Sequence, residues 1–359
     1  MARMAVLLSG GVDSSVALHL MHRQGHELEA FYLKVWLEDE LEYLGQCPWE
    51  EDLEYIEKIC RPLGIPLHVV PIQQDYWQRV IAHSLEEIRA GRTPNPDMLC
   101  NSRIKFGAFL DQIDSAFDKV VTGHYAATIQ KDGITFLKRV ADPIKDQTYF
   151  LAHLTQEQLS RAHFPIGAYV KSEIRQMAQD WQLPNQDRPD SQGLCFLGKI
   201  RFRDFVRHHM GEKPGPYINL DTGETVGEHQ GYWFYTIGQR HGLGLSHGPW
   251  FVAGRDIAQN IIYISNTYYD PGKERRELWV GRLNWLSGYH PQKESMQVKL
   301  RHGPKIHDCE IEPQGDRLFV RLRANDQGIA AGQYAVFYQE GICLGCGMIL
   351  EDQIKDLTV

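Results

Sequence analysis

The stretch "MAVLLSGGVDSS", residues 4–15, decides the fold of this chain. Its five apolar residues predict a buried strand, and a turn with two glycines and three serines follows before a helical pattern begins. Glycines at such a turn let the backbone approach a ligand closely, and the helix directs the positive end of its dipole at the same point. The stretch therefore predicts a phosphate-binding loop at the carboxyl end of the first strand.

This loop lacks the lysine that a Walker-type loop directs at the β- and γ-phosphates. We expect positive φ at Gly10 and Gly11, so that backbone N–H groups and serine hydroxyls form the cradle. Asp13 is suited to capping the helix or to helping hold Mg²⁺. Such a cradle favours pyrophosphate as a leaving group and attack at the α-phosphate. The alternative is a plain strand-to-helix turn with an Asp or Ser N-cap.

Outward from the loop, strands and helices alternate. Strands are predicted at residues 4–9, 28–37, 66–72 and 119–123, and helices at 14–23, 49–64, 75–91 and 103–113. This pattern is typical of an α/β protein with a doubly wound parallel sheet, whose ligand lies beyond the carboxyl ends of the strands. A hairpin is expected at residues 129–140, with Asp132 and Gly133 at its turn.

The composition changes near residue 210, where glycines and aromatic residues accumulate. The pattern of the last 80 residues predicts short strands with alternating polar and apolar residues. We therefore expect three domains: a catalytic α/β domain over residues 1–200, a small β-rich domain over 201–280 and an antiparallel β-barrel over 281–359.

Composition and charge indicate which partners, location and cysteine chemistry to expect. The net charge is −8, but nine acidic residues lie in the segment 38–57, so the rest of the chain is close to neutral and RNA remains a possible partner. No apolar run is long enough to cross a membrane, and the first strand begins too early for a signal peptide, so a cytoplasmic location is expected. Seven cysteines, an odd number, suggest reduced thiols rather than a disulfide framework.

Two of the cysteines lie in unusual loops. In "GRTPNPDMLCNSRIKFG", residues 91–107, a proline-stiffened loop places Cys100 just before a predicted helix with Arg103 and Lys105, a setting that lowers a thiol pKa. Asp97 could serve there as a general acid or base. In "RPDSQGLCFLG", residues 188–198, Cys195 lies among turn formers. The pair suits cycling through persulfide and disulfide, and the alternative for Cys100 is an ordinary core cysteine.

A second pair, Cys343 and Cys346 in "CLGC", could suggest metal ligands. Residues three apart in a regular strand face opposite sides, and no further pair with suitable spacing accompanies them. We therefore expect core cysteines and no structural metal site.

The loop "SGGVDSS" resembles the signature of the PP-loop ATP pyrophosphatases. Together with residues 91–107, "TGHYA" (122–126), "KDQTYFL" (145–151), "DSQGLCFLG" (190–198) and "GQRHGLG" (238–244), it makes almost the whole chain resemble the bacterial tRNA-specific 2-thiouridylases. The resemblance implies ATP-dependent replacement of O2 by sulfur on the wobble uridine of tRNA, with Mg²⁺. It also implies a persulfide donor as partner, such as a cysteine desulfurase or a sulfur-relay protein, and a C-terminal barrel that contacts tRNA.

The resemblance also implies roles for individual residues. Cys195 would carry the persulfide sulfur, Cys100 would act as nucleophile and form a disulfide with it, and Asp97 would be the acid or base. The residues implied for ATP are Leu7, Leu8, Ser9, Gly10, Gly11, Val12, Asp13, Ser14, Leu33 and Gly123. Those implied for tRNA are Asn95, Pro96, Asp97, His124, Lys145, Asp146, Gln147, Arg301, His302 and Gln333.

Two other functions stay open at this point. An amidating or ligating PP-loop enzyme with a small substrate would leave Cys100 and Cys195 without a role and would need an ammonia source. A non-catalytic RNA-binding protein would use nucleotide only for structure and would form no AMP.

Overall fold

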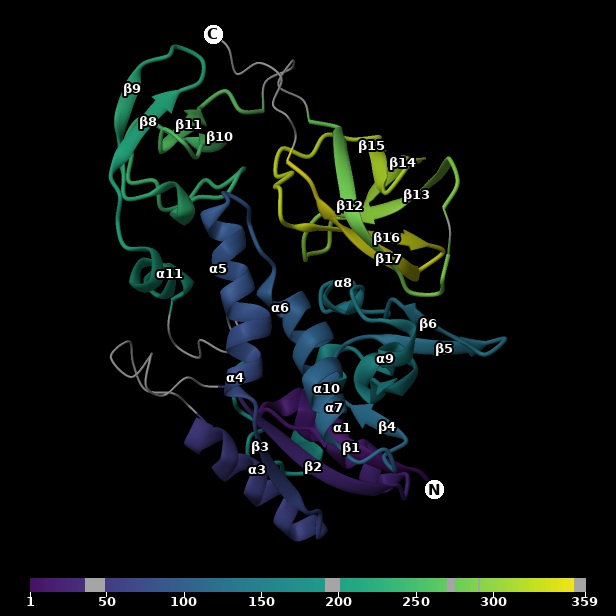
Figure 1. Cartoon of the computed structure of the whole chain (residues 1–359). Helices are drawn as coiled ribbons and strands as arrows, with labels where there is room; N and C mark the ends of the chain where they lie inside the picture. Colours follow the sequence, from purple (N-terminus) through teal and green to yellow (C-terminus); the bar gives the residue numbers. More distant parts are fainter. Residues whose placement is uncertain (36–48, 191–200, 270–274, 290, 352–359) are drawn as a thin grey trace.

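The structure is a computed structural model that describes residues 1–35, 49–190, 201–269, 275–289 and 291–351 (Figure 1). Cys195 lies outside the described residues, so its predicted role has no structural counterpart below. Within the described part of the chain, no helix combines the length and the apolar character needed to cross a membrane.

The N-terminal unit is built on five parallel strands in the order β3-β2-β1-β4-β7. Their bounds are Arg3–Leu7 for β1, Glu27–Lys34 for β2, Leu67–Pro71 for β3, Lys119–Val121 for β4 and Ala162–His163 for β7. The order changes direction between β1 and β4, which is the switch point where such sheets bind ligands. The predicted doubly wound parallel sheet is confirmed.

Both faces of the central strand β1 are buried. Ala5 and Leu7 of β1 pack into one apolar cluster, whereas Met4 and Val6 pack into another with helix α1, Val12–Arg23. A central parallel strand therefore needs apolar residues on both faces, which explains the unbroken run at the start of the chain. The other long helices are α3, Trp49–Leu63, and α10, Lys171–Asp180.

Two helical rods rise from this unit toward the other domains (Figure 1). The first comprises α4, Gln73–Tyr76, a π-helical segment at Trp77–Ile81, and α5, Ala82–Arg89. The second comprises α6, Pro96–Leu99, a π-helical segment at Cys100–Ala108, and α7, Phe109–Gln112. Shorter helices are α8, Thr148–Leu151, α9, Gln156–Arg161, a 3₁₀ turn at Pro165–Ala168, and α11, Phe202–Met210.

The second rod corrects one prediction. The helix begins at Pro96 rather than near Arg103, so Cys100 lies inside it and not in a loop ahead of it. The side chain of Asn95 caps the helix by accepting a hydrogen bond from the Met98 N–H at 3.2 Å. An Asn N-cap followed by proline at the first helical position is a strong local start signal, which the loop-like composition of this stretch obscured.

The last strands form a closed six-stranded antiparallel barrel, in which β12 pairs with both β15 and β17. The strands are β12, Glu277–Trp285, β13, Glu294–Lys299, β14, His307–Gln314, β15, Arg317–Leu322, β16, Tyr334–Gln339, and β17, Ile342–Ile349. The predicted barrel is confirmed, and its first strand begins four residues before the expected boundary at 281.

The hairpin of β5, Ala127–Lys131, and β6, Ile134–Lys138, extends the barrel sheet by pairing with β17. Asp132 and Gly133 have φ of 52° and 77°, as the predicted tight turn requires. A separate four-stranded sheet in the order β10-β11-β8-β9 forms the central domain. Its strands are β8, Gly215–Asn219, β9, Thr225–His229, β10, Phe251–Asp256, and β11, Ile261–Ser265.

Strand β17 contains an irregularity that corrects the prediction for Cys343 and Cys346. The pairing with β16 shifts register between Phe337 and Tyr338, so Leu344 turns into the barrel core while both cysteines join the cluster facing the N-terminal unit. A bulge breaks the alternation on which the opposite-face prediction rested. Both thiols are buried, and burial raises the pKa of each, so the prediction of core cysteines is confirmed.

Candidate active site

The phosphate loop lies between β1 and α1, at the switch point of the sheet. Gly10 has φ of +73°, whereas Gly11 has φ of −80°, so only one of the two glycines uses the left-handed conformation expected of both. The hydroxyls of Ser14 and Ser15 donate to the Gly11 carbonyl oxygen at 3.1 and 2.9 Å. The Ser14 oxygen also accepts from the Ser9 N–H at 3.3 Å, which tightens the turn.

The loop after β4 lies directly against the phosphate loop. A Cβ added to Gly123 would stand 2.7 Å from the Ser14 nitrogen, so only glycine allows this approach. The next residue, His124, hydrogen-bonds Thr122 Oγ1 through Nδ1 at 2.8 Å and packs edge-on against Phe164. Burial lowers the pKa of His124 well below its usual value, which favours the neutral ring.

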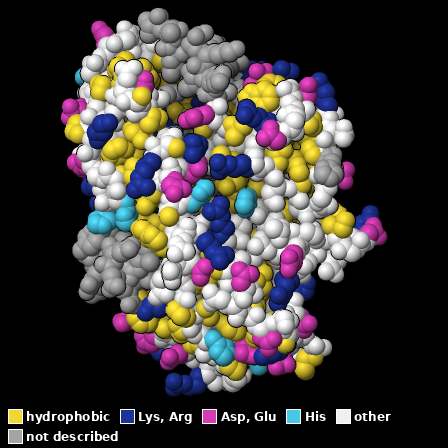
Figure 2. All heavy atoms as spheres, viewed as in Figure 1, with side chains coloured by type: hydrophobic (Ala, Val, Ile, Leu, Met, Phe, Trp, Pro, Cys, Tyr) yellow, Lys and Arg dark blue, Asp and Glu magenta, His cyan; other side chains and the backbone are white. Residues whose placement is uncertain are grey.

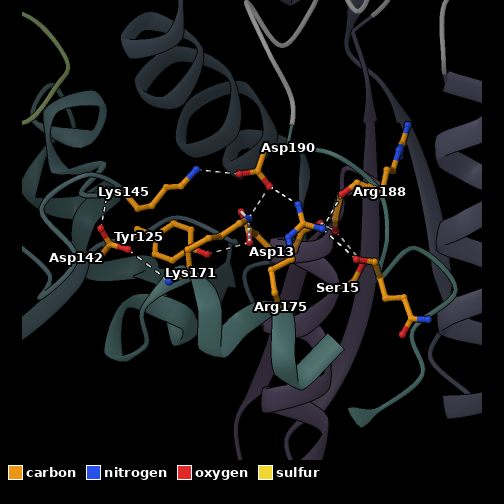
Figure 3. A network of polar contacts seen from close by, with 12 residues as sticks. Asp13, Ser15, Tyr125, Asp142, Lys145, Lys171, Arg175, Arg188 and Asp190 are labelled. Carbon is orange, nitrogen blue, oxygen red and sulfur yellow. Dashed lines mark hydrogen bonds and ion pairs between the residues drawn. The ribbon is translucent and has the colours of Figure 1, made fainter. Parts of the chain in front are cut away.

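Asp13 does not cap helix α1. Its carboxylate accepts a hydrogen bond from the Tyr125 hydroxyl at 3.0 Å and pairs with Lys171 Nζ at 2.7 and 3.0 Å (Figure 3). Lys171 is the first residue of α10, far from the loop in sequence. The ammonium thus stands next to the loop that has no lysine of its own.

Asp190 is the second anion of this network. It binds Lys145 at 2.8 Å, Lys171 at 2.7 Å and Arg175 at 2.6 Å (Figure 3). Burial alone would raise the pKa of Asp190, but hydrogen bonds to Lys145 and Lys171 outweigh it and hold the pKa well below its usual value. One carboxylate therefore joins a residue predicted to contact tRNA, Lys145, to the cation beside the phosphate loop.

The segment before Asp190 lies over the loop itself. The Asn185 amide donates to the Gly10 carbonyl at 2.7 Å and to Ser15 Oγ at 2.9 Å. Arg188 pairs with Asp52 of α3 at 2.5 Å, and a Cβ added to Gly10 would stand 2.7 Å from Arg188 Nη1. Burial raises the pKa of Asp52 above its usual value, although Arg188 acts in the opposite direction. The guanidinium of Arg188 therefore rests against the backbone of the phosphate loop.

Cys100 opens the π-helical segment of the second rod and is 3% exposed. Within this segment a Cβ on Gly107 would stand 2.9 Å from the Ser102 carbonyl oxygen, so glycine accommodates the wider helical turn. Single π-turns are frequent at functional sites. Phe106 of the same segment packs edge-on against Phe164, whose ring also contacts His124. The β4 loop therefore connects the phosphate loop to the helix that carries Cys100.

The stretch that leads into this helix is held by the barrel and the central domain. The Thr93 N–H donates to the Ala331 carbonyl at 2.8 Å, and the Gln333 amide donates to the carbonyls of Thr93 and Pro94 at 3.0 and 2.9 Å. On the other side, Thr93 Oγ1 contacts Thr236 Oγ1 at 3.4 Å. Asn95 and Asp97 thus follow a clamped stretch, and both are partly exposed.

The remaining residues predicted for tRNA fall into two groups. Arg301, His302 and Lys145 reach the surface, and the His302 ring packs on Phe150 at 4.6 Å. Asp146 is buried and pairs with Lys299 and Arg139, and the Gln147 side chain accepts from the Tyr125 N–H at 2.9 Å. A role of these residues toward tRNA stays a prediction.

Arg301 lines a cavity of about 650 Å³ between the three domains, together with Thr93, Gln239, Lys305 and Gln333. Its guanidinium is oriented by both oxygens of Asp326, at 2.7 and 2.8 Å. Figure 2 shows Lys, Arg and His side chains gathered near the middle of the face it views, where the helical rods meet the barrel. This collection of charge suits a polyanionic ligand.

Sequence reasoning missed the residues that surround the phosphate loop from outside: Asp52, Lys171, Arg175, Asn185, Arg188 and Asp190. Asp52 belongs to the acidic segment 38–57, whose composition indicates only a charge imbalance. The turn formers near Arg188 and Asp190 are the one available signal, and by themselves they indicate only an accessible loop around Cys195. Among the described residues, no group of three or more His, Cys, Asp or Glu could hold a metal ion.

Known proteins match the chain along its length. Family models match residues 2–199 (tRNA methyl transferase HUP domain), 203–266 (tRNA methyl transferase PRC-barrel domain) and 275–349 (aminomethyltransferase beta-barrel domain). The tRNA-specific 2-thiouridylase MnmA of Parabacteroides distasonis is 43% identical over 354 residues, or 97% of this chain and 99% of the relative. MnmA 1 of Bacteroides thetaiotaomicron is 45% identical over 353 residues, or 96% and 99%.

Among solved structures, a 4-thiouridine synthetase–RNA complex with bound ATP is similar over 55% of this chain and 45% of that chain, at 15% identity and a TM-score of 0.35.

The sheet order and the loop at its switch point define a doubly wound α/β protein of the PP-loop class. The full-length relatives make the assignment narrower. The chain belongs to the tRNA-specific 2-thiouridylase family, which is a family of enzymes.

Proposed function

We propose that the protein is an ATP-dependent sulfurtransferase that converts the wobble uridine of tRNA, position 34, to 2-thiouridine. The observation that carries the proposal is the β4 loop, which touches the phosphate loop through Gly123 and reaches the Cys100 helix through His124 and Phe164. The ATP site, where the uridine oxygen would be activated, would therefore lie next to the helix that carries the Cys100 thiol. The relatives named as tRNA-specific 2-thiouridylases support tRNA as the substrate.

In the first step, O2 of the uridine attacks the α-phosphorus of ATP and pyrophosphate leaves. The ATP site would comprise Leu7–Ser14, Leu33 and Gly123, with backbone groups and serine hydroxyls around the phosphates. Asp13 would hold Mg²⁺ together with phosphate oxygens, since Mg²⁺ prefers a carboxylate ligand combined with substrate phosphates, and the ion would neutralise their charge. Asp13 fits this role because its carboxylate lies beside the loop, where its negative charge is paired with the ammonium of Lys171.

In the second step, the terminal sulfur of a persulfide on Cys195 attacks C2, and AMP leaves with the original oxygen. The thiolate of Cys100 then attacks the Cys195 sulfur and breaks the sulfur–sulfur bond, which yields 2-thiouridine and a Cys100–Cys195 disulfide. A thiol reductant resets the pair. Asp97, three residues before Cys100 on the same helix, would act as the general acid or base.

The tRNA site would extend from Asn95, Pro96 and Asp97, against the target base, to the exposed cations Lys145 and Arg301. His124 and His302 would line the same path. We infer that Asp146, Gln147 and Gln333 contribute through the residues they hold, because their side chains are engaged in contacts within the protein.

A reconstitution assay tests the proposal. Purified protein, unmodified tRNA, ATP with Mg²⁺ and a persulfide donor are combined, and AMP and thiolated nucleoside are measured together. We expect both products in equal amounts from the wild type and no 2-thiouridine from Cys100→Ser or Cys195→Ser. Cys309→Ser is the matched control, because that thiol is buried in the barrel core and its pKa is raised by burial to about 12.

Full thiolation by either cysteine variant would contradict the sulfur-transfer step. AMP formation on a small-molecule substrate, with no thiolated nucleoside, would instead indicate an amidating or ligating enzyme. Binding of tRNA without AMP in any condition would indicate a non-catalytic RNA-binding protein.

A further inference from the structure

The positive charges near the phosphate loop come from residues that are distant from it in the sequence. Residues 9–15 contain neither lysine nor arginine. Folding brings four cations of the N-terminal unit to the loop and its surroundings: Lys145, Lys171, Arg175 and Arg188 (Figure 3).

Three of these cations, Lys145, Lys171 and Arg175, share one carboxylate, that of Asp190. Lys171 makes three short contacts, two with Asp13 and one with Asp190, so its ammonium is held between two carboxylates. Arg175 and Lys145 share the same Asp190, and Arg175 also donates to two backbone carbonyls, those of Gln186 and Arg188. This group fixes the frame around Asp13.

Arg188 is placed differently. Asp52 takes one side of its guanidinium, and Nη1 lies against Gly10, where only the absence of a Cβ leaves room for it. The rest of the guanidinium has donors in a planar fork that matches phosphate oxygens. Contacts on both sides of Arg188 in the chain keep its backbone at the loop. Before it, the Asn185 amide donates to the Gly10 carbonyl, and after it, Asp190 pairs with Lys171.

We propose that Arg188 replaces the lysine that the phosphate loop lacks: its guanidinium, positioned by Asp52, binds the pyrophosphate portion of ATP over Gly10. The inference rests on the proposed function insofar as ATP is the nucleotide. A guanidinium there makes charge-assisted hydrogen bonds to the β- and γ-phosphates and stabilises the negative charge on departing pyrophosphate. Asp52 is a positioning residue in this arrangement, because it reaches the phosphates only through Arg188.

Equilibrium binding to the full chain, without tRNA or sulfur donor, tests the proposal. Titration of wild type and Arg188→Met with ATP and with AMP, each with Mg²⁺, should show ATP binding about ten- to a hundredfold weaker in the variant. AMP lacks the pyrophosphate, so its affinity should stay within about twofold. Inorganic pyrophosphate should displace ATP from the wild type and do so poorly from the variant. Arg188→Lys should restore part of the ATP affinity.

Two further variants keep the test decisive. Arg3→Met is the matched control, because Arg3 pairs with Glu29 at 2.8 Å at the opposite end of β1 and should leave both affinities unchanged. Asp52→Asn retains the shape of the holding residue and should weaken ATP severalfold but not AMP, and it carries the test if Arg188→Met fails to fold. An ATP-to-AMP affinity ratio that is unchanged in the Arg188 variants and Asp52→Asn would overturn the proposal.

The outcome is separable from that of the proposed function. A wild type that prefers ATP to AMP through Arg188 but makes no 2-thiouridine would retain this inference and refute thiolation. Thiolation with an unchanged affinity ratio in the variants would do the reverse.

Discussion

Gly123 stands so close to Ser14 that a methyl group on it would reach within 2.7 Å of the Ser14 nitrogen. The atoms in the way belong to the backbone of the phosphate loop, not to a flexible side chain, so the loop itself must move. Gly123 has no unusual backbone conformation to strain; the constraint is space alone. Because Gly123 has no side chain, the loop that follows β4 can pack directly against the phosphate loop that follows β1.

We expect Gly123→Ala to weaken ATP binding by at least about tenfold, because the added methyl displaces the N-terminus of α1 that would face the phosphates. Equilibrium titration with ATP checks this, with the melting temperature measured in parallel. Gly133→Ala is the control for ATP affinity, since Gly133 lies at a hairpin tip with open space around it; its φ of 77° means that this substitution strains the turn, so it should lower the melting temperature and leave ATP affinity unchanged. Unchanged ATP affinity in Gly123→Ala would mean that the loop yields without loss of its cradle.

Gln333 gives a second prediction. Its amide holds the carbonyls of Thr93 and Pro94 ahead of Asn95, so Gln333→Ala should loosen the stretch that positions the target base. We expect the rate of thiolation to fall between about ten- and a hundredfold, with ATP affinity unchanged. Because no phosphate contact is removed, the dependence of tRNA affinity on salt should keep its slope, whereas Arg301→Met should reduce it. A reduced slope in Gln333→Ala would indicate a direct tRNA contact instead.

The sequence predicted what local patterns determine. A strand buried on both faces must be apolar throughout, and a glycine-serine turn before a helix suits a phosphate, so β1 and its loop were predictable from residues 4–15. The hairpin at Asp132 and Gly133 follows from turn chemistry in the same way. Each of these features depends on residues that are neighbours in the chain.

What the sequence missed depends on residues that are distant in the chain. Lys171 reaches Asp13 only because α10 packs beside α1, and Arg188 reaches Gly10 only because Asp52 of α3 holds it. Nothing in the local composition of either cation distinguishes it from a solvated surface charge. The bulge in β17 was missed for a different reason, since the shift that brings Cys343 and Cys346 to one side arises from pairing with β16.

Asp326 gives a prediction on pH. Burial would raise its pKa, but hydrogen bonds from Arg301 and Gly328 outweigh it and lower the pKa to about 2. The carboxylate is thus easier to protonate in the unfolded chain, so its stabilising contribution is complete above about pH 5 and is lost as the pH falls toward 2. In urea unfolding, the stability difference between wild type and Asp326→Asn should shrink by about 1 kcal/mol from pH 5 to pH 3. A difference independent of pH would refute this assignment.

Lys299 and Asp146 form an ion pair with both side chains fully buried, where the barrel meets the N-terminal unit. Lys299→Met should lower the free energy of unfolding by about 3 kcal/mol, because it removes a partner from a buried carboxylate that keeps Arg139 and Thr148. Adding Asp146→Asn to Lys299→Met should cost less than Asp146→Asn alone, since the Asp146 charge that Lys299→Met leaves without this partner is then removed.

Lys293 pairs with Glu312 at 2.8 Å on the surface, so Lys293→Met should change stability by less than about 0.5 kcal/mol. Chemical denaturation of the four variants measures each value, and strictly additive effects of the two buried substitutions would show that Lys299 and Asp146 do not stabilise the interface as a pair.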